Sequence, residues 1–81
     1  MTVDEILDER SEYGPFGRNS SRISRAFNAI TGMDSVPRPI EPRDYPAFMI
    51  VVKLVREYEN HKQDNLDDIC GYSKLWSEME K

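Results

Sequence analysis

The sequence predicts an all-α fold, a compact four-helix bundle-like single domain over residues 1–81. A chain of 81 residues has room for one domain only. Apolar residues recur at the spacings of three, four and seven that place side chains on one side of a helix, in four separate segments. Residues rich in glycine, proline or asparagine separate these segments, which indicates turns between helices.

The first predicted helix covers residues 2–12. Thr2 with Glu5 three residues later has the spacing of a capping box, which satisfies free backbone N–H groups at a helix start. The apolar residues that follow fall near one side of the helix: Val3, Ile6, Leu7 and Tyr13. We expect the Gly-Pro-Phe-Gly stretch at residues 14–17 to end it.

A second, short helix is expected to start after a cap at Asn19 or Ser20 and to end at Gly32. Its apolar residues follow the helical spacing: Ile23, Ala26, Phe27 and Ile30. The next segment, residues 33–43, contains three prolines, and proline disfavours the helical conformation in the residue before it. We therefore expect a Pro-rich linker that lies extended across the surface.

The third helix is expected from Tyr45 to about Glu59, with Asp44 as its cap and Pro46 in its first turn, where the missing N–H is tolerated. Residues 47–52 are apolar throughout and would also suit a strand. The helical spacing continues beyond them without a break, which favours one long central helix.

The fourth helix is expected to start at a cap formed by Asp64 and to pack antiparallel on the third. The residues expected at this contact are Leu66, Ile69, Tyr72 and Trp76. We expect Cys70 to be a small buried apolar residue. Gly71 lies in the middle of the helix, where glycine costs about 1 kcal/mol relative to alanine, so we expect a close neighbour there.

The charge distribution excludes a general nucleic-acid binder. The net charge is −4, whereas contacts with phosphate backbones need a basic surface. Residues 1–13 carry five acids against one arginine, and residues 44–81 carry eight acids against five bases. Residues 14–43 carry five arginines against two acids, so this middle block is the one part able to hold a phosphate or an acidic partner.

The sequence also suggests a compartment. No run of about 18 apolar residues could span a bilayer, and the acidic start is unlike a targeting peptide, so no membrane association and a cytoplasmic location are expected. A single cysteine can form no internal disulfide. Exposed aromatic and apolar residues left over from so small a core suggest a homo-oligomer.

Two carboxylates of the fourth helix could form either a structural ion pair or a metal site. Asp68 falls at the edge of the apolar side, with Asp64 one turn before it, and a partly buried acid needs a partner. The structural explanation is an ion pair with Lys53 or Arg56 of the third helix, or a tyrosine hydroxyl. The functional explanation is a magnesium site formed by Asp64 and Asp68 with an acid of the first helix, Glu9 or a neighbour of it.

The arginines of the second helix form a stripe at Arg18, Arg22 and Arg25, with spacings of four and three. Acids of the first helix with the same spacing, Glu5, Glu9 and Glu12, are natural structural partners for it. The functional alternative is that the planar guanidinium groups clamp a phosphate or an acidic partner protein. His61 has no nearby nucleophile, so we expect a turn residue that bonds a carbonyl or Asp64.

Three stretches of the sequence form a recognisable pattern together. They are Ile6-Leu7-Asp8-Glu9-Arg10 with Tyr13-Gly14-x-Phe16, then Lys53-x-x-Arg56, then His61-x-x-Asp64-x-x-x-Asp68-Ile69-x-Gly71-Tyr72-x-x-Leu75. The pattern resembles a family of small phage-encoded all-helical proteins of unassigned function. It is similar to the phage nucleotide-modification-associated helical domain and, more distantly, to MazG-type all-α nucleoside triphosphate pyrophosphohydrolases.

The resemblance implies a magnesium-dependent pocket for the phosphates of a nucleotide. Asp64 and Asp68, with Glu9, match metal-ligand positions, and Lys53 and Arg56 would meet the phosphates. The third helix departs from the enzyme pattern, because it has apolar residues where acids are expected.

We therefore expect a small phage accessory protein that acts as a non-enzymatic binding or effector protein on a host protein in the host cytoplasm. The alternative is a magnesium-dependent (deoxy)nucleotide-binding or pyrophosphohydrolase-like protein of phage nucleotide metabolism. The host target and the nucleotide are not identified by the sequence.

Overall fold

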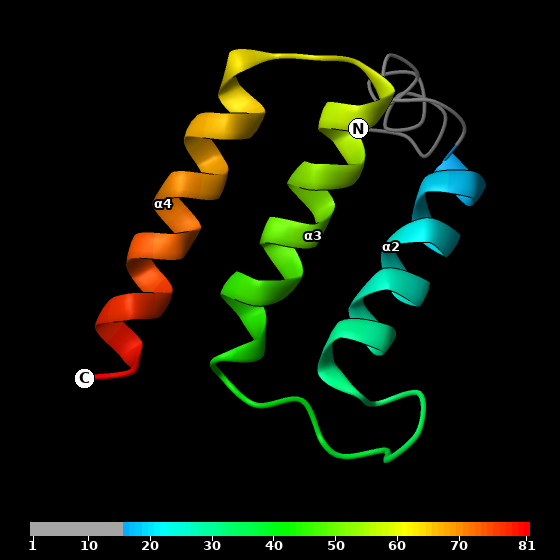
Figure 1. The fold of residues 1–81 in the computed structure, drawn as a ribbon, viewed down its shortest axis with the longest axis vertical. Helices are drawn as coiled ribbons and strands as arrows, with labels where there is room; N and C mark the ends of the chain where they lie inside the picture. Colours follow the sequence, from blue (N-terminus) through cyan, green and yellow to red (C-terminus); the bar gives the residue numbers. More distant parts are fainter. Residues whose placement is uncertain (1–15) are drawn as a thin grey trace, which may run out of the picture.

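The computed structural model describes residues 16–81, and this part of the chain is all-helical. It contains three helices, α2 (Phe16–Thr31), α3 (Asp44–Glu59) and α4 (Gln63–Met79). Their order along the chain is shown in Figure 1. The all-α class is thus confirmed. The helix expected over residues 2–12 lies outside the described residues.

The start of α2 differs from the expectation, whereas its end agrees. Asn19 and Ser20 lie inside the helix, so the predicted caps are wrong. The preceding glycine joins the first turn, because a glycine in a helix costs only about 1 kcal/mol. Gly32 has a φ of 78°, the left-handed conformation that ends many helices, and its carbonyl accepts the N–H of Val36 at 2.9 Å.

An irregular segment connects α2 to α3, as the prolines predict. Its first residues form a turn rather than extended chain, since the N–H of Ser35 also bonds the carbonyl of Gly32, at 3.1 Å. Further along, Val36 and Ile40 are 74% and 76% exposed. The segment therefore leaves apolar side chains at the surface.

The long helix α3 confirms the helical interpretation of residues 47–52. Pro46 lies fully buried in the first turn, where no helical N–H is lost. Arg43 takes the cap position, so Asp44, the predicted cap, is instead the first helical residue. Its carboxylate instead accepts hydrogen bonds from the preceding segment, described below.

The three helices lie side by side, with α3 in the middle (Figure 1). Neighbouring helices are antiparallel, so the carboxyl end of α4 and the amino end of α3 lie at the same end of the layer (Figure 1). The antiparallel packing of α4 on a central α3 is thus confirmed. The predicted cap of α4 is wrong, because the helix begins at Gln63 and Lys62, not Asp64, takes the cap position.

This layer has a very small core. The buried apolar side chains among residues 16–81 are Phe27, Val51 and Val55. Phe27 meets the ring of Phe48 edge-on, with centroids 5.2 Å apart. Asn65 of α4 is buried at 2% exposure, while the adjacent Leu66, expected at the contact, is 38% exposed. Asn65 is therefore the buried residue of α4 at the α3 contact, while Leu66 stays partly exposed.

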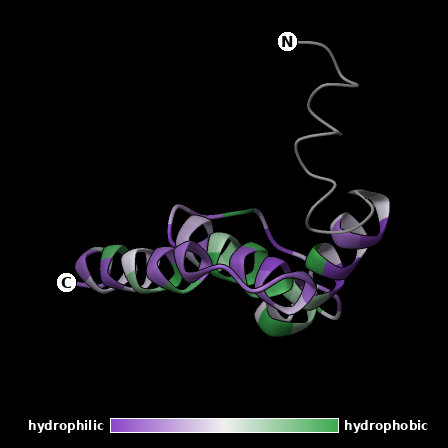
Figure 2. Cartoon of the chain, turned by 90° about the horizontal axis from the view of Figure 1, so that it is seen from above, coloured by the Kyte–Doolittle hydropathy of each residue, from purple (hydrophilic) through white to green (hydrophobic). Residues whose placement is uncertain are grey.

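Many large apolar side chains remain at the surface. Those exposed by 38% or more are Ile30, Val36, Ile40, Tyr45, Phe48, Leu54, Tyr58, Leu66, Leu75 and Met79. Figure 2 shows apolar stretches alternating with polar ones along the helices. In the described part of the chain, no helix is both long and apolar enough to cross a membrane.

Two expectations for α4 are wrong. Cys70 is exposed rather than buried. A Cβ built on Gly71 would meet nothing within 4 Å in the described structure, so no neighbour there requires a glycine. Both residues lie on sides of α4 that α3 does not cover.

Candidate functional site

Asp68 forms an ion pair across the α3–α4 contact. Its Oδ2 lies 2.9 Å from Nζ of Lys53, whose side chain is only 14% exposed, while that of Asp68 is 46% exposed. The pair joins the middle of α3 to the first half of α4. The structural partner that the sequence suggests for Asp68 is therefore present.

Of the other expected metal ligands, one lies near this pair on α4 and one lies outside the described residues. Asp64 is exposed one turn before Asp68, on the same side of α4. Glu9 lies outside the described residues. Within residues 16–81, no group of three or more His, Cys, Asp or Glu side chains is close enough together to hold a metal ion.

The two basic residues expected to meet phosphates both belong to α3. The ammonium group of Lys53 is held by Asp68. Arg56, one turn later, is half-buried. These side chains therefore contribute to the α3 surface, and a phosphate at Lys53 would have to compete with the Asp68 carboxylate.

Two arginines of the α2 stripe converge on one carboxylate at the end of α3. Nη2 of Arg18 and Nη1 of Arg22 lie 2.7 and 2.6 Å from carboxylate oxygens of Glu59. Glu59 is only 14% exposed in its side chain. The acids of residues 1–13, the expected partners, lie outside the described residues, so the structure assigns this role to Glu59.

The third arginine of the stripe is available to a partner. Arg25 is exposed, and its Nε donates a hydrogen bond to the backbone oxygen of Ser21, 3.4 Å away. Beside Glu59 in the chain, Tyr58 is 82% exposed. Arg18 and Arg22 thus meet the end of α3, Arg25 follows Arg22 by one turn on the same side of α2, and Tyr58 precedes their acceptor Glu59 in the chain. Arginine and tyrosine are residue types enriched at protein interfaces.

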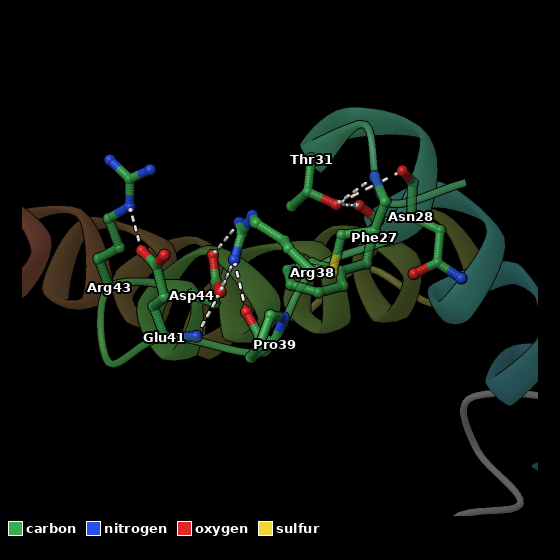
Figure 3. Close-up of polar contacts among 9 residues, drawn as sticks. Phe27, Asn28, Thr31, Arg38, Pro39, Glu41, Arg43 and Asp44 are labelled. Carbon is green, nitrogen blue, oxygen red and sulfur yellow. Dashed lines mark hydrogen bonds and ion pairs between the residues drawn. The ribbon is translucent and has the colours of Figure 1, made fainter. Parts of the chain in front are cut away.

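A second ion pair holds the linker on the start of α3 (Figure 3). Both terminal nitrogens of Arg38 donate to Asp44, at 2.7 and 2.8 Å, and the N–H of Glu41 donates to the same carboxylate at 2.7 Å. These donors hold the pKa of Asp44, 4% exposed, far below its usual value, and the carboxylate in turn raises the pKa of Arg38.

Glu57 organises the turn between α3 and α4. It contacts Nδ1 of His61, and it accepts the N–H of Lys62 at 3.0 Å and Nδ2 of the buried Asn65 at 3.2 Å. The bond with His61, together with the two others, lowers the pKa of Glu57 against the effect of its burial. His61 is a turn residue as predicted, but its partner is Glu57 rather than a carbonyl or Asp64.

Two adjoining hollows lie along the groove between α2 and α3. One, of about 230 Å³, is lined by Phe27, Ile40, Asp44, Tyr45 and Phe48. The other, of about 240 Å³, is lined by Ser20, Ile23, Ser24, Phe48 and Val52. Phe48 belongs to both, so the hollows form one continuous, mainly apolar groove.

Sequence reasoning missed three of these features. The partners Arg38 and Asp44 are six residues apart across prolines, a separation with no periodic signal. Glu59 and Asn65 could be assigned only once the helices were placed. The stripe of arginines was visible, but its acceptor was not.

Comparison with known proteins gives one match. A family model described as a domain of unknown function (DUF6378) matches residues 2–80. No curated protein and no solved structure matches the chain.

Proposed function

The chain belongs to the family of the DUF6378 domain, whose function is unknown, and from this premise we propose that it is a small non-enzymatic binding protein. The surface that carries the proposal is the Arg–Tyr surface, formed by Arg18, Arg22, Arg25 and Tyr58. Arginine and tyrosine dominate the residues at which protein interfaces gain most of their affinity.

The observation behind the proposal is that Arg18 and Arg22 converge on Glu59, whose neighbour in the chain, Tyr58, is 82% exposed. The carboxylate holds both guanidinium groups in place before a partner arrives, which reduces the entropy lost on binding. α2 contains three arginines and no acid. The surface therefore suits a protein partner with carboxylates or phosphorylated side chains.

The carboxylates of the layer support binding rather than catalysis. Asp68, Asp44 and Glu59 are each paired with a basic side chain, and Glu57 holds the turn. A carboxylate that serves as metal ligand or general base must be free to reach its ligand. Each of these acids instead stabilises a contact between helices or linker.

The resemblance of the sequence motifs to small phage proteins supports a host protein as the partner, in the cytoplasm of the host cell. The same motifs, together with the apolar side of residues 2–12, support a fourth helix that completes the bundle. Both are proposals that extend beyond residues 16–81.

A second candidate function has one observation in its favour. Asp64 and Asp68 lie one turn apart on an accessible side of α4, the arrangement in which two carboxylates can share a magnesium ion. With Glu9 as a third ligand, and Lys53 and Arg56 near the phosphates, the chain would bind or hydrolyse a nucleotide. This alternative requires Lys53 to release Asp68.

The test compares two variants in which a basic residue is replaced by glutamate, one within the Arg–Tyr surface and one outside it. Immobilised native protein captures its partner from host lysate, and Arg25→Glu together with Tyr58→Ser is expected to reduce that capture at least tenfold. Lys74→Glu, which makes the same charge change at an exposed position of α4, is the control and should retain capture. Equal capture by both variants would exclude the Arg–Tyr surface as the binding site.

A further inference from the structure

The side of the layer that carries the groove also carries exposed apolar side chains of the linker, α3 and α4. We call this side the groove face, and its apolar residues are Ile40, Tyr45, Phe48, Leu75 and Met79. Their exposed fractions run from 38% for Phe48 to 76% for Ile40. Ile40, Tyr45 and Phe48 line one hollow together.

The helix contacts place Leu75 and Met79 on this face. Asp68, Leu75 and Met79 are spaced by seven and four, so they lie on one side of α4. Asp68 is bonded to Lys53, and the ring of Tyr72 meets that of Tyr45, with centroids 6.2 Å apart. The side of α4 that bears Asp68 therefore adjoins the side of α3 that bears Tyr45.

The Arg–Tyr surface lies on other sides of the helices. Arg22 is two residues from both Ser20 and Ser24, which line the groove, and two residues turn a helix by about 200°. Tyr58 is thirteen residues from Tyr45, a rotation of about 220°. The groove face is thus separate from the proposed partner surface.

The apolar area of the groove face suits a stable dimer. If a fully exposed large side chain presents about 200 Å², the five residues expose roughly 500 to 600 Å² together. A standard interface buries about 800 Å² on each side, and homodimer interfaces are about 65% apolar. The five residues of the groove face alone therefore expose about the apolar area that one side of such an interface buries.

Charge favours a second copy over a charged partner. Two ion pairs within the chain border the groove face, Lys53 with Asp68 and Arg38 with Asp44. Residues 16–81 as a whole carry ten bases and ten acids. The excess of four acids of the whole chain lies in residues 1–15, so the described part of two copies brings no net charge to this contact, and a strongly charged partner would find no complementary surface here.

The groove and α4 lie on opposite sides of α3 (Figure 1), which makes the face complementary to itself. A twofold axis parallel to α3 places α4 of one copy over the groove of the other. Leu75 and Met79, 44% and 42% exposed, then enter the hollow beside Phe48. The hollow, of about 230 Å³, is adequate, since a closed cavity of about 150 Å³ accepts benzene.

We propose that the groove face is the interface of a homodimer, in which Leu75 and Met79 of each copy occupy the groove between α2 and α3 of the other. An axis perpendicular to the helices would instead place groove over groove and leave both hollows empty. The symmetric exchange of protruding side chains and hollows is the isologous contact that closes at two copies.

The test is sedimentation of the full chain over micromolar concentrations. The native protein is expected to sediment as a dimer of the 9.5 kDa chain. Leu75→Glu with Met79→Glu places two carboxylates in the apolar groove and should raise the dimer Kd at least 100-fold. Both side chains are partly exposed in the single chain, so the helical circular dichroism spectrum should be unchanged.

The matched control is Leu54→Glu with Leu66→Glu. These leucines are 41% and 38% exposed, and each lies nine residues, or half a turn, from Tyr45 and Leu75 respectively. The control should keep the native Kd. A native chain that stays monomeric, or a dimer that the control disrupts and the Leu75 and Met79 variant does not, would overturn the proposal.

The dimer and the proposed function can fail separately. Arg25→Glu should leave sedimentation unchanged while it reduces partner capture. If Arg25→Glu abolished the dimer, the groove face would not be the interface.

Discussion

Arg38 and Asp44 form a two-point ion pair that fastens the linker to the first turn of α3. The two nitrogens of Arg38 lie 2.7 and 2.8 Å from the two oxygens of Asp44, and the N–H of Glu41 adds a third bond at 2.7 Å (Figure 3). Because Asp44 also lines the groove, this pair sets the position of Ile40 beside Phe48.

The first prediction concerns the pH dependence that this pair creates. The pKa of Asp44 is lower in the folded than in the unfolded chain, so its ionisation stabilises the folded state. That contribution is fully present above the unfolded pKa of about 3.9 and is lost as the pH falls toward the folded pKa. Urea unfolding from pH 7 to pH 2 measures it.

Asp44→Asn is the matched variant for this titration. It is expected to be less stable than native protein at pH 7, and the difference should shrink steadily below about pH 4. A stability difference that stayed constant down to pH 2 would mean that the Asp44 carboxylate makes no contribution specific to its charge.

The second prediction concerns Asn65, the most buried polar residue of α4. Asn65→Ala removes the bond to Glu57 and leaves that carboxylate with one donor fewer. We expect a loss of about 1 to 3 kcal/mol in the free energy of unfolding, measured with urea. Ser73→Ala, at an exposed position of the same helix, should change stability by less than about 0.5 kcal/mol.

The third prediction contrasts two glycines. Gly32 has a positive φ, so Gly32→Ala is expected to destabilise the protein by about 1 to 2 kcal/mol. Gly71 lies in the middle of α4 with open space around its Cα, so Gly71→Ala should stabilise it by about 0.5 to 1 kcal/mol. Thermal unfolding of both variants checks the signs, and a destabilised Gly71→Ala would indicate a neighbour at that position.

The sequence predicted the helices better than the contacts between them. The periodicity of apolar residues located α3 to within one residue and the start of α4 to within two, because a buried stripe repeats regularly along a helix. The start of α2 was wrong, since a glycine was interpreted as a stop where the helix tolerates it. Cys70 was expected to be buried because a single helix wheel does not show how narrow the contact is when three helices form one layer.

In the candidate site, too, the residues were easier to predict than their contacts. Asp68 was singled out by its position at the edge of an apolar side, and its partner Lys53 was one of the three considered. The acceptor of the arginines, Glu59, was not found, because no local spacing connects α2 to the end of α3. Pairing across the layer depends on how the helices are set beside one another.

The last prediction addresses the central claim, that Asp68 is a structural residue of a binding protein and not a metal ligand. If Asp68 and Lys53 form only a structural pair, Asp68→Asn should lower the stability by about 1 kcal/mol without any metal. For a domain of this size the melting temperature would fall by about 4 to 8 °C.

The decisive measurement is the melting temperature of native protein and of Asp68→Asn, each with and without magnesium and a set of nucleoside triphosphates. A ligand that binds the folded state raises the melting temperature, and one that does not bind leaves it unchanged. The account predicts that magnesium and nucleotides shift neither protein and that Asp68→Asn melts lower in every buffer. A rise in the native protein that Asp68→Asn abolishes, together with release of pyrophosphate, would contradict it.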